Sequence, residues 1–204
     1  MLVTRYTHSC VRLEADDRVV VIDPGAWSEP EALTGADAVL VTHEHGDHVD
    51  RTLLARFSGD VYAPTGANDL AALAPIRLGV DTAVDLGGVT VEAVGGRHAH
   101  VVEGQRVCVN LGYIVDGLVY HPGDALHVPD QAIDTLFVPL QASWLKTAEA
   151  IDFVRAVAPR QAIGMHEGQV NERGLAALNH WLSTACAGVY RWLAPGDSVE
   201  IGPR

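Results

Sequence analysis

Residues 38–48 read Ala-Val-Leu-Val-Thr-His-Glu-His-Gly-Asp-His, an apolar run followed by three histidines and two acids within six positions. The composition gives a chance expectation of about 0.002 for the pattern His-x-His-x-Asp-His. His43 and His45 share a face in an extended chain but not in a helix, which predicts a metal-binding loop directly after a strand. With Asp47 and His48 this loop holds more donors than one tetrahedral ion accepts, which favours two neighbouring ions.

Further nitrogen and oxygen donors follow other predicted strands, each in or just after a glycine-containing turn. They are His98 and His100 after Gly95-Gly96, Asp124 after His121-Pro122-Gly123, and His166 after Gly164. The three cysteines are too far apart in the sequence for a zinc or redox motif. Donor sets of histidine and aspartate without cysteine favour a catalytic site for zinc, manganese or iron.

Short apolar runs rich in valine and isoleucine predict strands that alternate with helices. Strands are expected at residues 11–13, 19–22, 38–41, 82–94, 106–120, 135–138 and 161–164, joined by glycine-containing turns such as Asp116-Gly117. Helices are expected at residues 65–73, 147–157 and 172–185. The runs at 19–22 and 39–41 do not alternate with polar residues, so these strands should be covered on both faces. The fold class is therefore α/β or mixed α+β.

Length and charge limit the possible partners. The chain has 204 residues, and its 14 basic and 26 acidic side chains give a net charge of −12. This length predicts one domain over residues 1–204. The negative charge repels phosphate backbones and anionic lipids, so we expect neither nucleic acid nor a membrane as a partner. Without an export signal or a run of about 18 apolar residues, a cytoplasmic location is expected.

Taken together, these motifs resemble the metallo-β-lactamase superfamily, and within it the small stand-alone metal-dependent hydrolases that include lactonase-like and phosphodiesterase-like members. The resemblance rests on residues 43–48 after a strand, His98 after its glycine turn, Asp124 after residues 120–123, and the late His166. It spans nearly the whole chain. It implies a four-layer αββα sandwich with metals at one edge of the two sheets.

The resemblance also implies a role for each candidate ligand. It assigns the first metal to His43, His45 and His98, the second to Asp47, His48 and His166, and a bridging position to Asp124. The segments around His8 and Asp23 also look like family segments, which places these residues near the site. His100 lies two positions after His98, so it remains an alternative third ligand. Trp144 and Lys146 are expected to be a packed tryptophan and a solvated lysine.

The implied chemistry is hydrolysis of a small ester, lactone or phosphoester by a hydroxide that bridges two divalent ions, Zn²⁺ being favoured over Mn²⁺ or Fe²⁺. Asp47 would orient the hydroxide, and His8, His100 or a metal-bound water would protonate the leaving group. The charge of the ions would attract an anionic substrate. The alternatives are a single-iron oxidoreductase, a nuclease and a non-catalytic metal-binding protein; the oligomeric state stays open.

Overall fold

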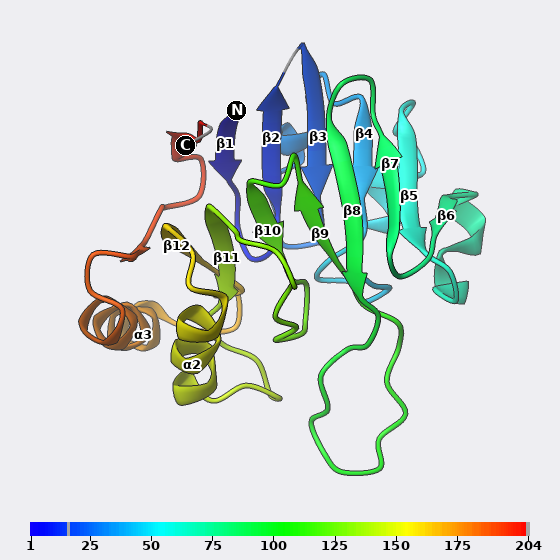
Figure 1. Cartoon of the computed structure of the whole chain (residues 1–204). Coiled ribbons are helices and arrows are strands. Elements are labelled where there is room, and N and C mark those ends of the chain that lie inside the picture. Colours follow the sequence, from blue (N-terminus) through cyan, green and yellow to red (C-terminus); the bar gives the residue numbers. More distant parts are fainter. Residues whose placement is uncertain (16, 203–204) are drawn as a thin grey trace.

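The computed structural model describes residues 1–15 and 17–202. Two seven-stranded mixed sheets pack face to face, and helices cover their outer faces (Figure 1). Sheet A has the order β14-β1-β2-β3-β4-β5-β6, with β1 at Leu2–Arg5, β2 at Val11–Ala15, β3 at Arg18–Ile22, β4 at Ala38–Leu40, β5 at Asp60–Pro64, β6 at Ile76–Leu78 and β14 at Ser198–Glu200. Sheet B has the order β13-β12-β11-β10-β9-β8-β7, with β7 at Thr82–Asp85, β8 at Thr90–Gly95, β9 at Leu111–Val115, β10 at Val119–His121, β11 at Thr135–Pro139, β12 at Gln161–Met165 and β13 at Tyr190–Arg191.

Alternate residues of the central strands face different apolar layers. Ile22 and Leu40 of sheet A lie in one buried cluster with Phe137 of sheet B, so this cluster fills the space between the sheets. Their neighbours Val21 and Val39 pack on the other side with apolar residues of the first helical layer. That layer consists of α1 (Arg51–Leu54) and two 3-10 helices, η1 (Pro30–Leu33) and η2 (Asn68–Leu73). These strands are therefore covered on both faces, as predicted.

The second helical layer covers sheet B with α2 (Thr147–Val157) and α3 (Glu172–Ala185), both at their predicted bounds. The buried residues of α2 are Ala150, Phe153, Val154 and Val157, the spacing of one helical face. They lie in a third cluster with Leu182 of α3 and apolar residues of sheet B. The four-layer αββα prediction is thus confirmed. No helix of the described chain is long and apolar enough to cross a membrane.

Three of the predicted elements need correction. The helix expected at 65–73 is only the 3-10 helix η2, because its start is displaced by Gly66 at φ +100° and it ends at Ala74 in the left-handed region. The strand expected at 82–94 is a hairpin of β7 and β8, turned by Gly87 and Gly88. The side chain of Asp85 accepts hydrogen bonds from both glycine N–H groups.

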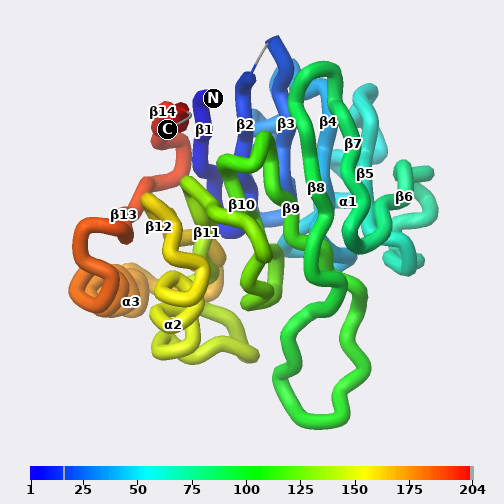
Figure 2. Tube along the Cα trace, in the orientation of Figure 1, coloured from blue at the N-terminus to red at the C-terminus, as the bar shows by residue number. Residues whose placement is uncertain are grey.

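The strand expected at 106–120 also splits, because Asp116 and Gly117 form a turn with positive φ between β9 and β10. A turn at these two residues was predicted. Residues 96–110 belong to no strand and form a long loop that projects beyond the strand ends (Figures 1 and 2).

Candidate metal centre

Six strands direct their carboxyl ends toward the same side of the sandwich. β1, β3 and β4 share one direction in sheet A, and β8, β10 and β12 share one direction in sheet B. The residues that follow these ends include His8, Asp23, His43, His45, Asp47, His48, His98, Asp124 and His166. A hydrogen bond of 2.9 Å from the N–H of Leu111 to the carbonyl of Thr42 joins the two sheets here. The strands therefore carry all the predicted ligands to one edge, from which the loop 96–110 projects (Figure 1).

His43, His45 and His98 form one group of donors, which we call set 1. Their ligand atoms lie within 4.8 Å of one another. Nε2 of His43 is 3.0 Å from Nδ1 of His45, and the ring of His98 lies 4.9 and 4.8 Å from the other two rings. His43 and His98 are buried, whereas His45 is exposed. Set 1 is thus open to solvent on the side of His45.

Asp47, His48 and His166 form a second group, which we call set 2. Their ligand atoms, with that of His8, also lie within 4.8 Å of one another. Nε2 of His48 is 3.3 Å from Nε2 of His166. Both imidazoles are buried, and Asp47 is half-buried.

The carboxylate of Asp124 lies between the two sets. Its Oδ1 is 2.9 Å from Nε2 of His166 and 3.1 Å from Nε2 of His48. Its Oδ2 is 3.3 Å from Nε2 of His98. One oxygen of Asp124 therefore faces set 2 and the other faces set 1.

Hydrogen bonds to Asp23 determine which nitrogen of His43 and His48 carries the proton. Asp23 is fully buried, and its Oδ2 lies 2.7 Å from Nδ1 of His48 and accepts from the hydroxyl of Thr42 at 2.6 Å. Since the Thr42 hydroxyl donates to Asp23, its oxygen accepts from Nδ1 of His43 at 3.0 Å. In their neutral forms, both rings therefore hold the proton on Nδ1 and present the lone pair of Nε2 to the site.

Backbone carbonyls play the same part for the other two buried imidazoles. Nδ1 of His98 lies 2.6 Å from the carbonyl of Ala99, and Nδ1 of His166 lies 2.5 Å from the carbonyl of Gln141. A carbonyl oxygen can only accept, so both Nδ1 atoms donate and both Nε2 atoms carry lone pairs. Second contacts of this kind are typical of histidines that bind metals.

These lone pairs provide a test of whether divalent ions fit the site. In the neutral rings, the lone pairs on Nε2 of His48 and Nε2 of His166 face each other at 3.3 Å, and a bound cation would relieve their repulsion. Nε2 of His98 is buried and has no hydrogen-bond partner, and Oδ1 of Asp124 faces the same two Nε2 atoms, which carry no proton in the neutral rings. Unpartnered buried polar atoms are rare and call for a bound group. The donor set therefore fits metal ions.

The pKa values at the centre shift in opposite directions. Burial disfavours charge on His48, but the carboxylates of Asp124 and Asp23 outweigh it and hold the pKa of His48 well above its usual range. Burial, followed by the charge of His48, lowers the pKa of His43 well below its usual range. Burial alone would raise the pKa of Asp124, but the charges of His166 and His48 hold it well below its usual range. Without an ion, the centre thus favours an ionised Asp124 next to a protonated His48, and a bound ion would take the place of that proton.

His8 lies beside set 2 with a defined proton position. The N–H of Gly168 donates to Nδ1 of His8 at 3.1 Å, so the proton of the neutral ring is on Nε2. Nε2 of His8 lies 3.2 Å from Oδ2 of Asp47 and donates to it. Trp27 packs on the ring of His8 with the centroids 4.7 Å apart. His8 therefore contacts a candidate ligand while both of its nitrogens are engaged.

The structure separates the two histidines that the sequence left as alternatives. His98 is buried and belongs to set 1. His100 is exposed on the projecting loop, where its Nε2 lies 3.2 Å from the guanidinium of Arg97. The geometry places His98 among the donors and leaves His100 outside them.

Trp144 contacts the centre in a way that sequence reasoning missed. Its indole N–H donates to Oδ2 of Asp124 at 3.1 Å, and its ring lies 6.3 Å from that of His98. Its position a few residues after β11, at the same edge, is the signal that pointed there. Lys146 is exposed, as predicted.

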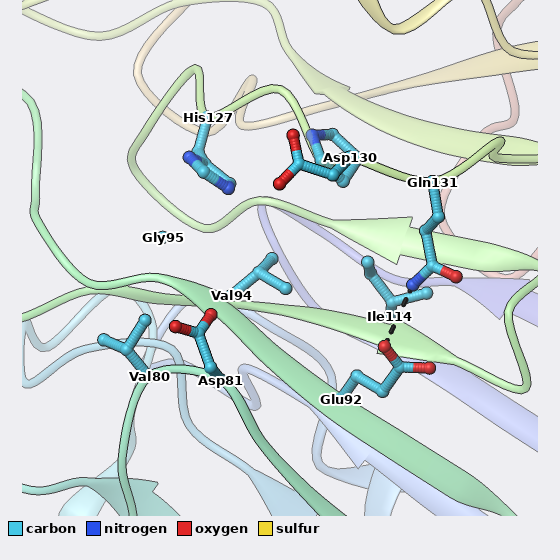
Figure 3. A pocket seen from close by; sticks show the side chains of 10 residues that line it. Val80, Asp81, Glu92, Val94, Gly95, Ile114, His127, Asp130 and Gln131 are labelled. Carbon is cyan, nitrogen blue, oxygen red and sulfur yellow. Dashed lines mark hydrogen bonds between the residues drawn. The ribbon is translucent and has the colours of Figure 1, made fainter.

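A surface cavity of about 500 Å³ lies away from the metal centre. It is lined by residues of β8, β9 and the segment 127–131, and none of the candidate ligands is among the described residues that line it (Figure 3). Glu92 accepts a hydrogen bond of 3.0 Å from the side chain of Gln131 there, and Asp81 and Asp130 add two more carboxylates (Figure 3).

Comparison with known proteins identifies the family. A family model described as "Beta-lactamase superfamily domain" matches residues 2–166. The chain belongs to the metallo-β-lactamase superfamily. The match covers the strand ends that carry His8 to His166, so the superfamily resemblance is confirmed.

Two superfamily relatives and one solved structure are similar over most of the chain. Protein Rv0786c of Mycobacterium tuberculosis is 38% identical over 183 residues, which cover 83% of this chain and 85% of the relative. A UPF0173 metal-dependent hydrolase of Methylobacterium nodulans is 29% identical, with 82% of this chain and 85% of the relative covered. The structure of Igni18, a metallo hydrolase from Ignicoccus hospitalis, superposes with a TM-score of 0.77 at 19% identity, over 100% of this chain and 99% of that one. This last likeness shows the fold alone.

Proposed function

We propose that this chain is a metal-dependent hydrolase that uses two divalent ions. The observation that carries the proposal is the position of Asp124, whose two oxygens face the two sets of donors separately. The similarity to proteins named metal-dependent hydrolases supports it. We further propose that residues 1–204 act as one domain.

Each set would hold one ion, and Asp124 would bind both. His43, His45 and His98 would hold the first ion, and Asp47, His48 and His166 the second. Zn²⁺ suits these nitrogen and oxygen donors, with Mn²⁺ or Fe²⁺ as alternatives. Sulfur takes no part, because the thiol of Cys108 lies 3.9 Å from Nε2 of His45 while the opposite nitrogen of that ring faces set 1.

When bound, two divalent ions lower the pKa of a shared water toward neutrality and polarise the bond to be cleaved. The side chains around them fix the geometry. The N–H of His8 orients Asp47 through Oδ2, and the carboxylate of Asp23 orients the ring of His48 through its Nδ1. The exposed side of set 1 at His45 provides the approach for substrate. His8 holds a proton at Nε2 and donates it in a hydrogen bond to Oδ2 of Asp47.

The proposed substrate is a small ester, lactone or phosphoester. The ions would concentrate positive charge at one edge of a chain whose net charge is −12, so an anionic substrate can bind there. The same net charge disfavours nucleic acid as a substrate. A cytoplasmic location remains part of this proposal.

The test is hydrolysis by purified, Zn²⁺-reconstituted protein of lactone, ester, thioester, phosphodiester and β-lactam panels. We expect turnover of at least one ester, lactone or phosphoester, and none with the matched variant Asp124→Asn, which excludes a contaminating enzyme. Oxygen consumption by an iron-loaded protein, with no hydrolysis on any panel, would replace this proposal by an oxidoreductase.

A further inference from the structure

An arginine is fully buried at the end of β1, close to set 2. Nε of Arg5 donates to the carbonyl of Gly164 at 2.9 Å, and its Nη2 pairs with the carboxylate of Glu167. The guanidinium lies over the ring of Trp192, 4.2 Å from its centroid. This ion pair links β1 of sheet A to the segment that follows β12 of sheet B.

Glu167 also contacts the backbone of His8. Its Oε1 accepts from the N–H of His8 at 3.1 Å, while its Oε2 pairs with Arg5. Glu167 follows His166 directly in the sequence. One buried carboxylate therefore joins the arginine to His8, which lies beside set 2, and to the chain at His166, which belongs to set 2.

His8 and His166 are held together in unfavourable backbone conformations. Their φ angles are +66° and +65°, in the left-handed region that side chains other than glycine rarely adopt. The N–H of His166 donates to the carbonyl of His8 at 2.9 Å, and the N–H of Gly168 donates to Nδ1 of His8 at 3.1 Å. Such conformations persist only where the surroundings hold them, and they concentrate at functional sites.

We propose that Arg5 and Glu167 are positioning residues for set 2. Their ion pair fixes the carboxylate of Glu167, which accepts from the N–H of His8. This hydrogen bond holds the backbones of His8 and His166 in their paired conformation. The rings then point to Asp47 and to the second ion. The inference rests on the proposed two-ion function.

Stability alone gives a poor reason for this ion pair. Burying an ion pair costs desolvation, and its replacement by apolar residues of similar volume is often neutral or stabilising. Nη1 of Arg5 is buried without a hydrogen-bond partner, which adds to the cost. The pair is therefore expected to serve the geometry of His8 and His166.

Two double variants separate positioning from stability. Arg5→Met/Glu167→Gln removes both charges but keeps an oxygen that accepts from the N–H of His8. Arg5→Met/Glu167→Met also removes the acceptor. Because both lose the ion pair together, neither leaves a charge buried alone, and both should unfold at temperatures close to that of the wild type.

The readouts are the affinities for two Zn²⁺ ions, measured against a competing chelator, and the ¹⁵N shifts of the His8 ring in the zinc-loaded protein. The variant with Gln keeps the acceptor but loses the ion pair that holds it, so it should bind one ion about three- to tenfold more weakly than the wild type, with the His8 proton still on Nε2. The variant with Met should bind one ion about 10- to 100-fold more weakly. Its His8 ring should no longer hold the proton on Nε2 alone. If the double variants do not fold, Glu167→Asp with Arg5 retained keeps both charges and withdraws the acceptor from the N–H of His8, and it should weaken the binding of one ion.

Equal affinities and equal His8 shifts in both variants and the wild type would overturn the inference. So would equal losses in the two variants, or equal weakening of both ions. A wild-type protein that binds one ion would contradict the proposed function instead, because the His8 shifts still show whether Glu167 positions that ring.

Discussion

The two sets of donors are held in different ways, although they share Asp124. In set 2, His48 and His166 are almost fully buried, with exposed fractions of 0% and 2%. Nδ1 of His48 donates to Asp23, and the ring and the N–H of His166 donate to the carbonyls of Gln141 and His8. In set 1, His45 is exposed, and its outward nitrogen has only a thiol 3.9 Å away.

This difference suggests that set 2 holds its side chains rigidly, whereas set 1 is accessible to solvent and substrate. A buried network fixes ring orientation at low cost on binding, which favours tight retention of the second ion. An exposed ring can exchange contacts with solvent or substrate. We therefore expect the first ion to be held more weakly than the second and to lie on the side that substrate approaches.

The largest effect is expected from Asp124→Ala, because this carboxylate faces both sets. Both ions should be weakened and activity should fall at least about 100-fold. His166→Ala should weaken mainly the second ion. Titration of each variant with Zn²⁺ measures the affinity lost at each of the two ions. Two ions bound to Asp124→Ala at wild-type affinity would show that Asp124 does not bridge.

His98→Ala should reduce set 1 alone, lowering the affinity for the first ion at least about tenfold together with activity. His100→Ala is the matched control, since His100 is exposed on the loop, and it should keep both ions. Elemental analysis of the metal content of the two variants decides whether His98 or His100 is a ligand of the first ion. The assignment fails if His100→Ala empties the first site and His98→Ala leaves it filled.

Asp23→Asn should weaken the binding of the second ion more than that of the first. It removes the charge that orients His48 and, through Thr42, His43. Loss of such a partner typically costs about 10- to 100-fold in metal affinity. Since Asp23 contacts His48 directly and His43 only through a hydroxyl, the second ion should lose more than the first. A greater loss of the first ion would contradict this order.

Trp144→Phe removes one hydrogen bond to Asp124 and keeps an aromatic ring. The oxygen concerned faces His98, so the first ion should weaken by about tenfold or less while the second is unchanged. Stepwise Zn²⁺ titration checks this. Unchanged affinity for both ions would show that Trp144 only packs against the site.

The smallest effect concerns Glu29, which supports the segment before His8. Burial opposes its ionisation, but hydrogen bonds from the N–H and hydroxyl of Thr7 outweigh burial and hold the pKa of Glu29 below its usual range. A lowered pKa stabilises the fold above the unfolded pKa, and this contribution is lost as the pH falls through the folded pKa. Glu29→Gln should therefore lower the melting temperature of metal-free protein by about 1 to 2 °C at pH 7. The difference should shrink below about pH 4.5, and a difference that grows there would contradict the cause given.

The parts of this centre that depend on local sequence were predictable. A strand followed by a turn brings its next residues to a sheet edge, so the positions of His43, Asp124 and His166 followed from apolar runs and glycine turns. The chain from 65 to 73 has the composition of an α-helix, but it forms a 3-10 helix at Asn68–Leu73, between Gly66 and Ala74, which both have positive φ. Composition alone does not report such backbone limits.

Contacts between distant parts of the chain could not be predicted. Arg5 and Glu167 are 162 positions apart, and neither belongs to a motif. The carbonyl that holds His166 belongs to Gln141, and any residue can supply a carbonyl. Trp144 has the signature of a packed aromatic residue, and only the structure shows its N–H on Asp124.

The central claim is that two sets of donors bind two ions and share Asp124. The most direct test is the number of Zn²⁺ ions per chain in reconstituted wild-type protein, measured by elemental analysis with stepwise titration. The account predicts two ions per chain, the second held more tightly than the first. One ion per chain at saturating Zn²⁺, or none, would contradict it.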